Sequence, residues 1–587
     1  MTSSKPGLFA REATGLVREI GFTLGVIIIL SHVIGLGWQK RAFQFTGPRP
    51  VPTDMLPLGL PAIFWAFLVC GIIVLITGYA AGYVTAAMPR SGGGYVTISR
   101  VTHPILGYMS GWLMFLAEAF SYGLIGVAVF EAIGIFYNIA LAPEVITWAS
   151  DPVILFVGGL VVVWIFAILA LLGTKLYGRL MEVIFYVPAV VTIAFFAMWI
   201  GGVMDPNTVV TGVRDVMSTA TTTTTPTSLM NLAVNTGMID HMSDFYGAFS
   251  FALAGAFWAY MGWYATTFVA GEVKEANKKL PLVVVSAGLI IMLVYLAASS
   301  LSAISIMNVP IDAAGNTYIT DANGHQWGFF QGYSWLSYGG SSINWTAVGI
   351  PQSVIDAGTQ WKFLDINFQN AWSTGIASLI ARGMAMGWLS WIIALAGVLW
   401  LANDIPPFLL VASRTFFAMS FDRMLPESFA YVSERWHAPV WSIIITAVAG
   451  IFGCIAESNI AGLAPYFNFA GVVGTDIFDA FFLTMFCVSC MLLPLERREI
   501  YDRAAVKHSI GTVVLLGFVA TLGAGYCLYT FVKESPWIFN PSGEEIYSTI
   551  GFFLCIAIGL LLYVYHLYRN TTRGVDVKTL YMSIPPE

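Results

Sequence analysis

The sequence predicts an all-α membrane protein with twelve transmembrane helices. Hydrophobic residues make up 57% of the 587 residues and charged residues only 10%, and the mean hydropathy is +0.77. These values lie far outside the range of soluble globular proteins. Apolar runs of about 20 residues, enough to cross the hydrocarbon core as a helix, recur along the chain, so we expect it to cross the bilayer many times.

Twelve runs of this length can be placed, with ends defined to a few residues. In chain order they are 20–45, 59–88, 104–138, 152–173, 179–201, 246–270, 281–306, 375–418, 439–456, 463–491, 509–532 and 547–568. All six cysteines fall inside these runs, where a thiol usually packs as a small hydrophobic group. Cys487 and Cys490 form a CxxC pair without a second pair or a histidine cluster, which favours core packing over metal binding.

Lysine and arginine mark one side of the predicted spans. With the N-terminus inside, the inner segments carry 20 of the 27 basic residues, which is a strong positive-inside bias. We therefore expect both termini in the cytoplasm and a multi-pass protein of the plasma membrane. The net charge of −6 is small for this length and the basic residues are scattered, so no nucleic-acid-binding surface is expected.

Two predicted outer segments are long. Residues 202–245 contain the stretch STATTTTTPTS, a low-complexity tract that we expect to form a mobile surface loop. Residues 307–374 are rich in Gly, Asn, Tyr and Trp and include the glycosylation sequon Asn344-Trp345-Thr346. This second segment either packs as a lid over an outer vestibule or only decorates the surface.

Glycines interrupt two of the spans, one early in each half of the chain. Gly35 and Gly37 lie in the first span, and Gly255 and Gly262 flank a run of aromatic residues in the sixth. Interrupted helices survive in a membrane only where they are buried in protein or line a cavity, and a matching pair suggests two repeats with a site between them. Helix ends offer free N–H groups to an anion and free carbonyls to an ammonium, which suits a zwitterion such as an amino acid. A packing notch for a neighbouring helix is the alternative reading of the glycines.

Four stretches of the chain resemble the amino acid-polyamine-organocation (APC) transporter superfamily. VIGLGW (33–38) resembles the glycine motif of its first span, and PRSGGGYVTISRVTHPILGYMSGW (89–112) resembles the junction of spans two and three. FWAYMGWYATTFVAGEVKEANKKLP (257–281) is similar to span six and the following inner loop, and SRTFFAMSFDRMLPESFAYVSERWHAP (413–439) is similar to the loop after span eight.

The resemblance implies the leucine-transporter fold and alternating access. Spans one to five and six to ten would be inverted repeats, spans one and six would be unwound at the substrate, and two helices would be peripheral. This divides the chain into six regions. They are a cytoplasmic N-terminal tail (1–18), a first repeat (19–201), an outer loop (202–245), a second repeat that includes the outer loop 307–374 (246–491), the peripheral spans (492–569) and a cytoplasmic C-terminal tail (570–587).

The same resemblance implies a substrate site. The N–H groups around Leu36 and Gly37 would hold a carboxylate. The carbonyls of Val33, Trp258 and Met261 would hold the amino group. Trp258 and Phe408 would cover the substrate, although aromatic packing between helices is the alternative for Phe408. The implied substrate-binding residues are Val33, Ile34, Gly35, Leu36, Gly37, Trp258, Met261, Gly262 and Phe408.

The chain also departs from the family pattern. Leu36 stands where many relatives have a small hydroxyl residue, and it would crowd or dry the pocket. Span six reads Gly262-Trp263-Tyr264, without the acidic residue of the family motif. Pro188 stands where some proton-coupled relatives have a lysine in span five, so a fixed internal cation is not supplied there.

Ionisable residues inside spans are functional candidates because their burial is costly. Asn403 and Asp404 fall where sodium-coupled relatives place two ligands of the ion. Their oxygens suit a hard cation, Asp404 could instead take a proton, and a structural, hydrogen-bonded Asp404 remains the alternative. Pro406 and Pro407 follow and are expected to kink or open span eight. His32 could shuttle a proton, although a hydrogen bond to a neighbouring helix is favoured.

Four other buried acidic residues are expected to pair between helices rather than meet the substrate: Glu118, Glu131, Asp476 and Asp479. No motif pairs a nucleophile with a base or gathers metal ligands, so we expect no enzyme and no cofactor beyond Na⁺ or H⁺ as coupling ion. The sequence thus predicts a secondary transporter of amino acids or related amines, with the substrate and the lipid bilayer as partners and no assignable oligomeric state. An exchanger, a channel or a ligand sensor of the same fold is the alternative.

Overall fold

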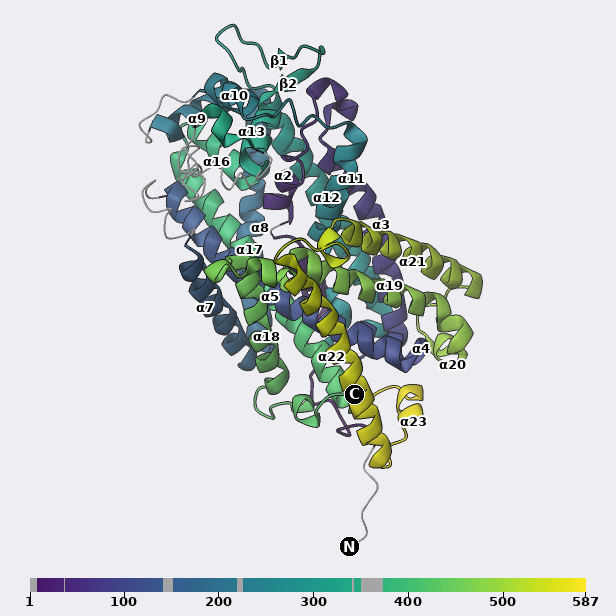
Figure 1. The fold of residues 1–587 in the computed structure, drawn as a ribbon. Helices are drawn as coiled ribbons and strands as arrows, with labels where there is room; N and C mark the ends of the chain where they lie inside the picture. The colour runs from purple at the N-terminus through teal and green to yellow at the C-terminus, as the bar shows by residue number, and fades with distance from the viewer. Residues whose placement is uncertain are drawn as a thin grey trace.

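The computed structural model describes residues 8–35, 37–140, 151–218, 225–339, 343–349 and 373–586, and these fold almost entirely into helices (Figure 1). Ten of the described helices are long and apolar enough to cross a membrane, and each coincides with one of the predicted segments. They are α3 (Ala62–Ala87), α5 (Pro104–Ala140), α7 (Pro152–Leu171), α8 (Thr174–Met204), α12 (Ala276–Met307), α17 (Gly387–Phe421), α18 (Val440–Ser458), α19 (Val472–Glu496), α21 (Ile510–Lys533) and α22 (Glu545–Thr572). The apolar window of α5 is 89% buried and that of α22 only 22%, so α5 lies at the centre of the bundle and α22 at its rim.

Two predicted spans differ in detail. Segment 375–418 holds two helices, because Ala385 adopts a positive φ of 61° between α16 (Ser373–Gly383) and α17. Segment 463–491 begins in short 3-10 turns, and α19 starts only after the extended Gly471. Helix α17 runs through Pro406 and Pro407 as one element, so the prolines do not open it.

The remaining predicted segments, 20–45 and 246–270, hold shorter helices that end in the buried interior. Helix α1 (Phe22–Val33) is followed by an irregular stretch, by the π-helical turn η1 (Gly37–Arg41) and by the short α2 (Ala42–Gln44). Helix α11 (Phe245–Tyr260) ends before Gly262, which has a φ of +92°. The 3-10 turns η5 (Ala265–Phe268) and η6 (Ala270–Glu272) then lead to α12.

Short elements gather at the two ends of the bundle. Strands β1 (Tyr318–Thr320) and β2 (Gln326–Gly328) pair antiparallel at the upper end in Figure 1, near α9 (Asn207–Ser218), α10 (Pro226–Asn235) and α13 (Phe329–Tyr338). At the lower end lie α4 (Gly93–Val101), α20 (Arg498–Arg503) and α23 (Val577–Met582). Segment 202–245, expected as a loop, therefore contains two helices. Residues 219–224 of its threonine-rich tract lie outside the described residues.

Helix α13, within segment 307–374, is packed into the bundle rather than laid on its surface. Phe330 and Tyr333 meet Phe43 of α2, with ring centroids 6.1 and 6.4 Å apart. The hairpin is attached to the loop before α3, since the Gln326 N–H donates to Asp54 at 2.7 Å and His325 Nδ1 lies 3.2 Å from Asp54 Oδ2. This packing argues against a segment that only decorates the surface, and the role as a lid stays a prediction. Asn344 of the sequon is exposed, and residues 350–372 lie outside the described part of the segment.

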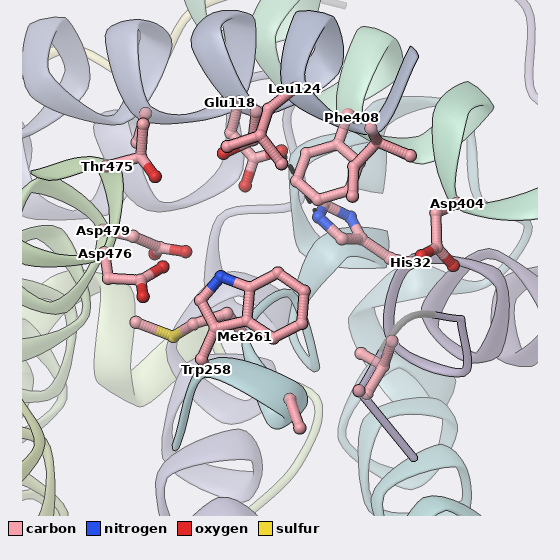
Figure 2. Close-up of a pocket in the computed structure, with 16 residues that line it drawn as sticks. His32, Glu118, Leu124, Trp258, Met261, Asp404, Phe408, Thr475, Asp476 and Asp479 are labelled. Carbon is pink, nitrogen blue, oxygen red and sulfur yellow. Dashed lines mark ion pairs between the residues drawn. The ribbon is translucent and has the colours of Figure 1, made fainter. Parts of the chain in front are cut away.

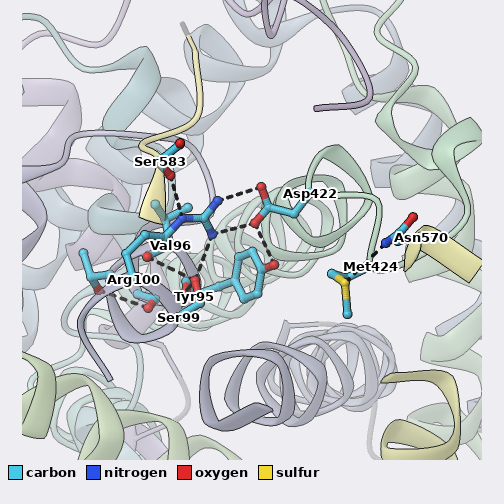
Figure 3. Close-up of polar contacts among 10 residues, drawn as sticks. Tyr95, Val96, Ser99, Arg100, Asp422, Met424, Asn570 and Ser583 are labelled. Atoms are coloured by element: carbon cyan, nitrogen blue, oxygen red, sulfur yellow. Dashed lines mark hydrogen bonds and ion pairs between the residues drawn. The ribbon is translucent and has the colours of Figure 1, made fainter. Parts of the chain in front are cut away.

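A buried ion pair joins the lower ends of α4 and α17 (Figure 3). The Arg100 guanidinium donates to both carboxylate oxygens of Asp422, at 2.5 and 2.8 Å, and the Tyr95 hydroxyl donates to the same carboxylate at 2.7 Å. All three side chains are buried. Burial alone lowers the pKa of Arg100, but the charge of Asp422 outweighs this and raises it, so Arg100 keeps its charge.

The six cysteines are free thiols, five of them buried, and Cys487 and Cys490 are among those five. Among the described residues no group of three or more His, Cys, Asp or Glu could hold a metal ion. Cys487 and Cys490 both pack in the hydrophobic core of the bundle.

Replacing Asp422 with Asn should strongly destabilise the fold, because it leaves the buried Arg100 charge uncompensated. Breaking a buried pair on one side costs about 3 to 5 kcal/mol, which thermal unfolding of the purified protein would detect as a large fall in apparent Tm. The double variant Arg100→Met with Asp422→Leu should recover most of the loss. An unchanged Tm in Asp422→Asn would contradict a structural role for the pair.

Candidate functional site

A small buried cavity lies where α1 and α11 end (Figure 2). Helices α1, α5, α11, α17 and α19 supply its walls. Its volume of about 30 Å³ is room for one or two water molecules, so a larger ligand requires helices or side chains to move. The lining residues are His32, Val33, Gly37, Ala117, Glu118, Ser121, Leu124, Ile125, Trp258, Ala259, Met261, Asp404, Phe408, Thr475, Asp476 and Asp479.

Seven of the residues predicted to bind the substrate or the coupling ion line this cavity: His32, Val33, Gly37, Trp258, Met261, Asp404 and Phe408. Four other predicted site residues do not line the cavity: Ile34, Gly35, Gly262 and Asn403. Each of them is next in sequence to a lining residue or packs against one. Leu36 lies outside the described residues, so its expected effect on the pocket stays a prediction.

The glycines are explained by close approaches between elements. A Cβ on Gly35 would overlap the carboxylate of Asp404, and a Cβ on Gly37 would lie 2.6 Å from Ala259 Cβ and 2.9 Å from Tyr295 Oη. A Cβ on Gly262 would overlap the His32 ring, and its positive φ is also a conformation that favours glycine. These glycines therefore serve as packing notches at the points where the helices end.

Side chains within the bundle satisfy the carbonyls freed at the helix ends. The Tyr295 hydroxyl, from α12, is within donating distance of the Val33 carbonyl at 2.5 Å and of the Ala259 carbonyl at 2.8 Å. Gln39 Nε2 donates to the Gly35 carbonyl at 2.8 Å, and the Met261 N–H donates to the Trp258 carbonyl at 3.0 Å. The Val33 carbonyl, expected to take an amino group, thus already accepts two bonds, because the Gly35 N–H also donates to it at 3.1 Å. The Trp258 carbonyl, expected to do the same, accepts one bond and keeps a second lone pair.

Acidic side chains dominate the charge of the cavity. Figure 2 shows Asp476 and Asp479 on one side and Asp404 beside His32 on the other. The lining residues include no lysine or arginine, so the cavity attracts cationic groups.

The structure changes the ranking of the buried acids. Two of them do pair between helices, as expected. Glu118 lies 3.4 Å from His32 Nε2, and Asp479 accepts a hydrogen bond from the hydroxyl of Tyr264. Together with Asp476 they also line the cavity, which the sequence had not led us to expect. Glu131 does not line it. Neither the acids nor Tyr295 could have been placed there from sequence, because a helix that is apolar on all sides gives no signal of which face meets the site.

His32 packs between two groups of the site. Its ring centroid lies 4.2 Å from that of Phe408, and its other neighbour is the Glu118 carboxylate. Its side chain is buried, and neither ring nitrogen has a hydrogen-bond partner among the described residues. The favoured hydrogen bond to a neighbouring helix is therefore not formed, and the contact with α5 is the approach to Glu118 at 3.4 Å. Asn403, next to Asp404 in the chain, is fully buried but is not among the residues that line the cavity.

Comparison with known proteins places the chain among transporters. A family model described as "Amino acid permease" matches residues 22–562. The chain is 23% identical over 292 residues to the "Serine/threonine exchanger SteT" of Bacillus subtilis, which covers 49% of this chain and 54% of that protein. It is 21% identical over 277 residues to the "b(0,+)-type amino acid transporter 1" of Mus musculus, which covers 47% and 48%.

The human protein of the same name is 22% identical over 282 residues, covering 47% and 48%. The chain therefore spans about half the length of the curated relatives it matches. The family match, in contrast, extends over nearly the whole sequence and includes every element that lines the cavity. With its many apolar helices, the chain is a multi-pass membrane protein that belongs to the amino acid permease family, a family of transporters rather than enzymes.

Proposed function

We propose that the protein is a secondary active transporter of amino acids or related amines that works by alternating access. The observation that carries this proposal is the buried cavity at the ends of α1 and α11, lined by acidic and aromatic side chains. Membership of the amino acid permease family supports it.

The proposed architecture counts twelve spans. The ten long helices supply ten of them, and α1 and α11, with the irregular segments that follow, supply the first and the sixth. The two would then begin inverted repeats, made of α1, α3, α5, α7 and α8 and of α11, α12, α17, α18 and α19, with α21 and α22 peripheral. The distribution of basic residues supports cytoplasmic termini in the plasma membrane, so the lower end of Figure 1 would face the cytoplasm.

The chemistry of the cavity suits a ligand with an ammonium group. Asp404 and the group of Glu118, Asp476 and Asp479 offer carboxylates on opposite sides. Backbone N–H groups near Gly37 are the proposed partners of a substrate carboxylate, as at other helix ends. Trp258 and Phe408 would cover the bound substrate, and the cavity would widen when it enters.

Asp404 is the proposed site of coupling to H⁺ or Na⁺. Its carboxylate is buried, lines the cavity and touches the backbone of Gly35, so a change in its charge would act directly on the end of α1. His32 and Asn403 are the supporting candidates on either side. Exchange without ion coupling is the second candidate, favoured by the printed name of the Bacillus relative, a serine/threonine exchanger.

Purified protein in liposomes should accumulate a labelled amino acid above its equilibrium level when a Na⁺ or H⁺ gradient is imposed. A screen of the twenty common amino acids and the simple polyamines identifies the substrate, and uptake against time gives the accumulation ratio. Exchange of internal for external substrate, without accumulation under either gradient, would leave transport intact and refute the coupling.

Asp404→Asn should abolish accumulation driven by the gradient, because the amide can neither take a proton nor neutralise a cation in the same way. Exchange of labelled for unlabelled substrate should persist. Glu131→Gln is the matched control, since it changes a carboxyl group that lies within a predicted span but does not line the cavity. Unchanged Na⁺ and pH dependence in Asp404→Asn would contradict the assignment.

Gly37→Leu should block substrate binding, because even its Cβ would lie 2.6 Å from Ala259. Overpacking of this kind costs about 1 to 3 kcal/mol, and each 1.4 kcal/mol is about tenfold in affinity, so we expect a loss of about 5-fold to 140-fold. Gly21→Ala, at the N-cap of the preceding helix α1, where a Cβ meets nothing within 4 Å, should bind normally. Wild-type affinity in Gly37→Leu would remove the substrate from this cavity.

A further inference from the structure

A second and larger cavity opens at the lower end of the bundle, between α1, α8 and α17. Its volume is about 300 Å³, which is at the lower end of the range for small-molecule pockets. None of its lining residues belongs to the first cavity. The lining residues are Glu19, Ile20, Leu24, Ile28, Tyr177, Gly178, Arg179, Met181, Glu182, Lys274 and Leu410.

Four charged side chains surround this cavity: Glu19, Glu182, Arg179 and Lys274. In the described part of the chain none of them forms an ion pair, whereas Arg100 and Arg414 nearby are paired with Asp422 and Glu272. Two carboxylates and two cations thus face one space without neutralising each other. Their sum is zero, which matches a ligand that carries one charge of each sign.

A buried hydroxyl gives an independent indication of a ligand. Tyr177 lines the same cavity, is only 1% exposed, and its hydroxyl has no hydrogen-bond partner among the described residues. Leaving a buried polar group unsatisfied destabilises the fold, so a group that can donate to this hydroxyl or accept from it stabilises the arrangement. A ligand ammonium or carboxylate provides such a group.

The charged residues are held in place by backbone pairing. Ile20 forms a bridge with Val273, in which the Ile20 N–H donates to the Glu272 carbonyl at 3.0 Å and the Lys274 N–H donates to the Ile20 carbonyl at 2.9 Å. This places Glu19 and Lys274 next to each other. The buried pair of Glu272 with Arg414, at 2.9 Å, fixes the same turn to α17, so this side of the cavity is formed by a rigid frame.

We infer that this cavity is a second binding site for a zwitterionic amino acid, on the side of the protein from which the substrate leaves the first site. The inference rests on the proposed transport function. Glu19 and Glu182 bind the ammonium, Arg179 and Lys274 bind the carboxylate, and Tyr177 supplies a further hydrogen bond. Leu24, Ile28, Met181 and Leu410 provide an apolar wall for the side chain. A zwitterionic lipid headgroup shares this chemistry, and the experiment separates the two sources.

The test is the number of amino acids bound per chain. The full-length protein in phosphatidylcholine nanodiscs is equilibrated with a radiolabelled mixture of the twenty amino acids at saturating concentration. We expect about two bound per chain in the wild type and about one in Gly37→Leu, which disables the first cavity. Arg179→Gln and Glu182→Gln should each reduce the wild-type value to about one, and either of them combined with Gly37→Leu should abolish binding. Lys278→Gln, an exposed charge outside the cavity, is the matched control and should bind two.

Each other result overturns the inference in a distinct way. One amino acid per chain in the wild type, lost in Gly37→Leu, refutes the second site and leaves the proposed function standing. No binding to the wild type refutes both. Binding to Gly37→Leu that the Arg179 and Glu182 variants leave unchanged places the second site elsewhere. A parallel arm measures bound phosphatidylethanolamine by mass spectrometry. If this lipid remains on the wild type, is absent from the charge variants and excludes the labelled amino acid, the cavity binds lipid instead.

Discussion

A helix that ends inside a membrane protein must satisfy its freed backbone groups without water, and this requirement governs the centre of the molecule. Helices α1 and α11 both end there, where an unsatisfied carbonyl costs several kcal/mol. Tyr295 and Gln39 supply the donors, and they can do so only because glycines let the neighbouring elements approach. The position of Asp404 against Gly35 and that of His32 against Gly262 follow from the same close packing.

Hydropathy predicted the long helices well because each of them satisfies its backbone within one continuous segment. Hydropathy was less successful in predicting where a helix begins or ends when a single residue determines the position. The division between α16 and α17 depends on the conformation of Ala385, and α9 and α10 are short helices in a segment whose composition resembles a loop. Their formation depends on contacts between distant parts of the chain, which local propensity does not record.

The sequence predicted the part of the candidate site that lies where α1 and α11 end. It predicted less of the lining that the other helices supply. Glycines inside apolar runs and the family resemblance together led to His32, Val33, Gly37 and Trp258, all of which line the cavity. The acidic residues of α5 and α19 were expected to pair between helices and not to meet the substrate. The sequence of a wholly apolar helix does not show which of its faces points to the site. Tyr295 gave no signal at all, since its role requires two carbonyls from two other helices.

Tyr295 has a consequence that concerns the count of protons rather than the shape of the site. A hydroxyl carries one hydrogen, yet its oxygen is within reach of the carbonyls that end two different helices. Only one of them can accept this hydrogen at any moment, so the two helix ends compete for a single hydroxyl hydrogen, although the Val33 carbonyl also accepts from the Gly35 N–H at 3.1 Å. An ammonium that supplies a further hydrogen would relieve the competition. Its arrival would then act on the ends of α1 and α11 at once.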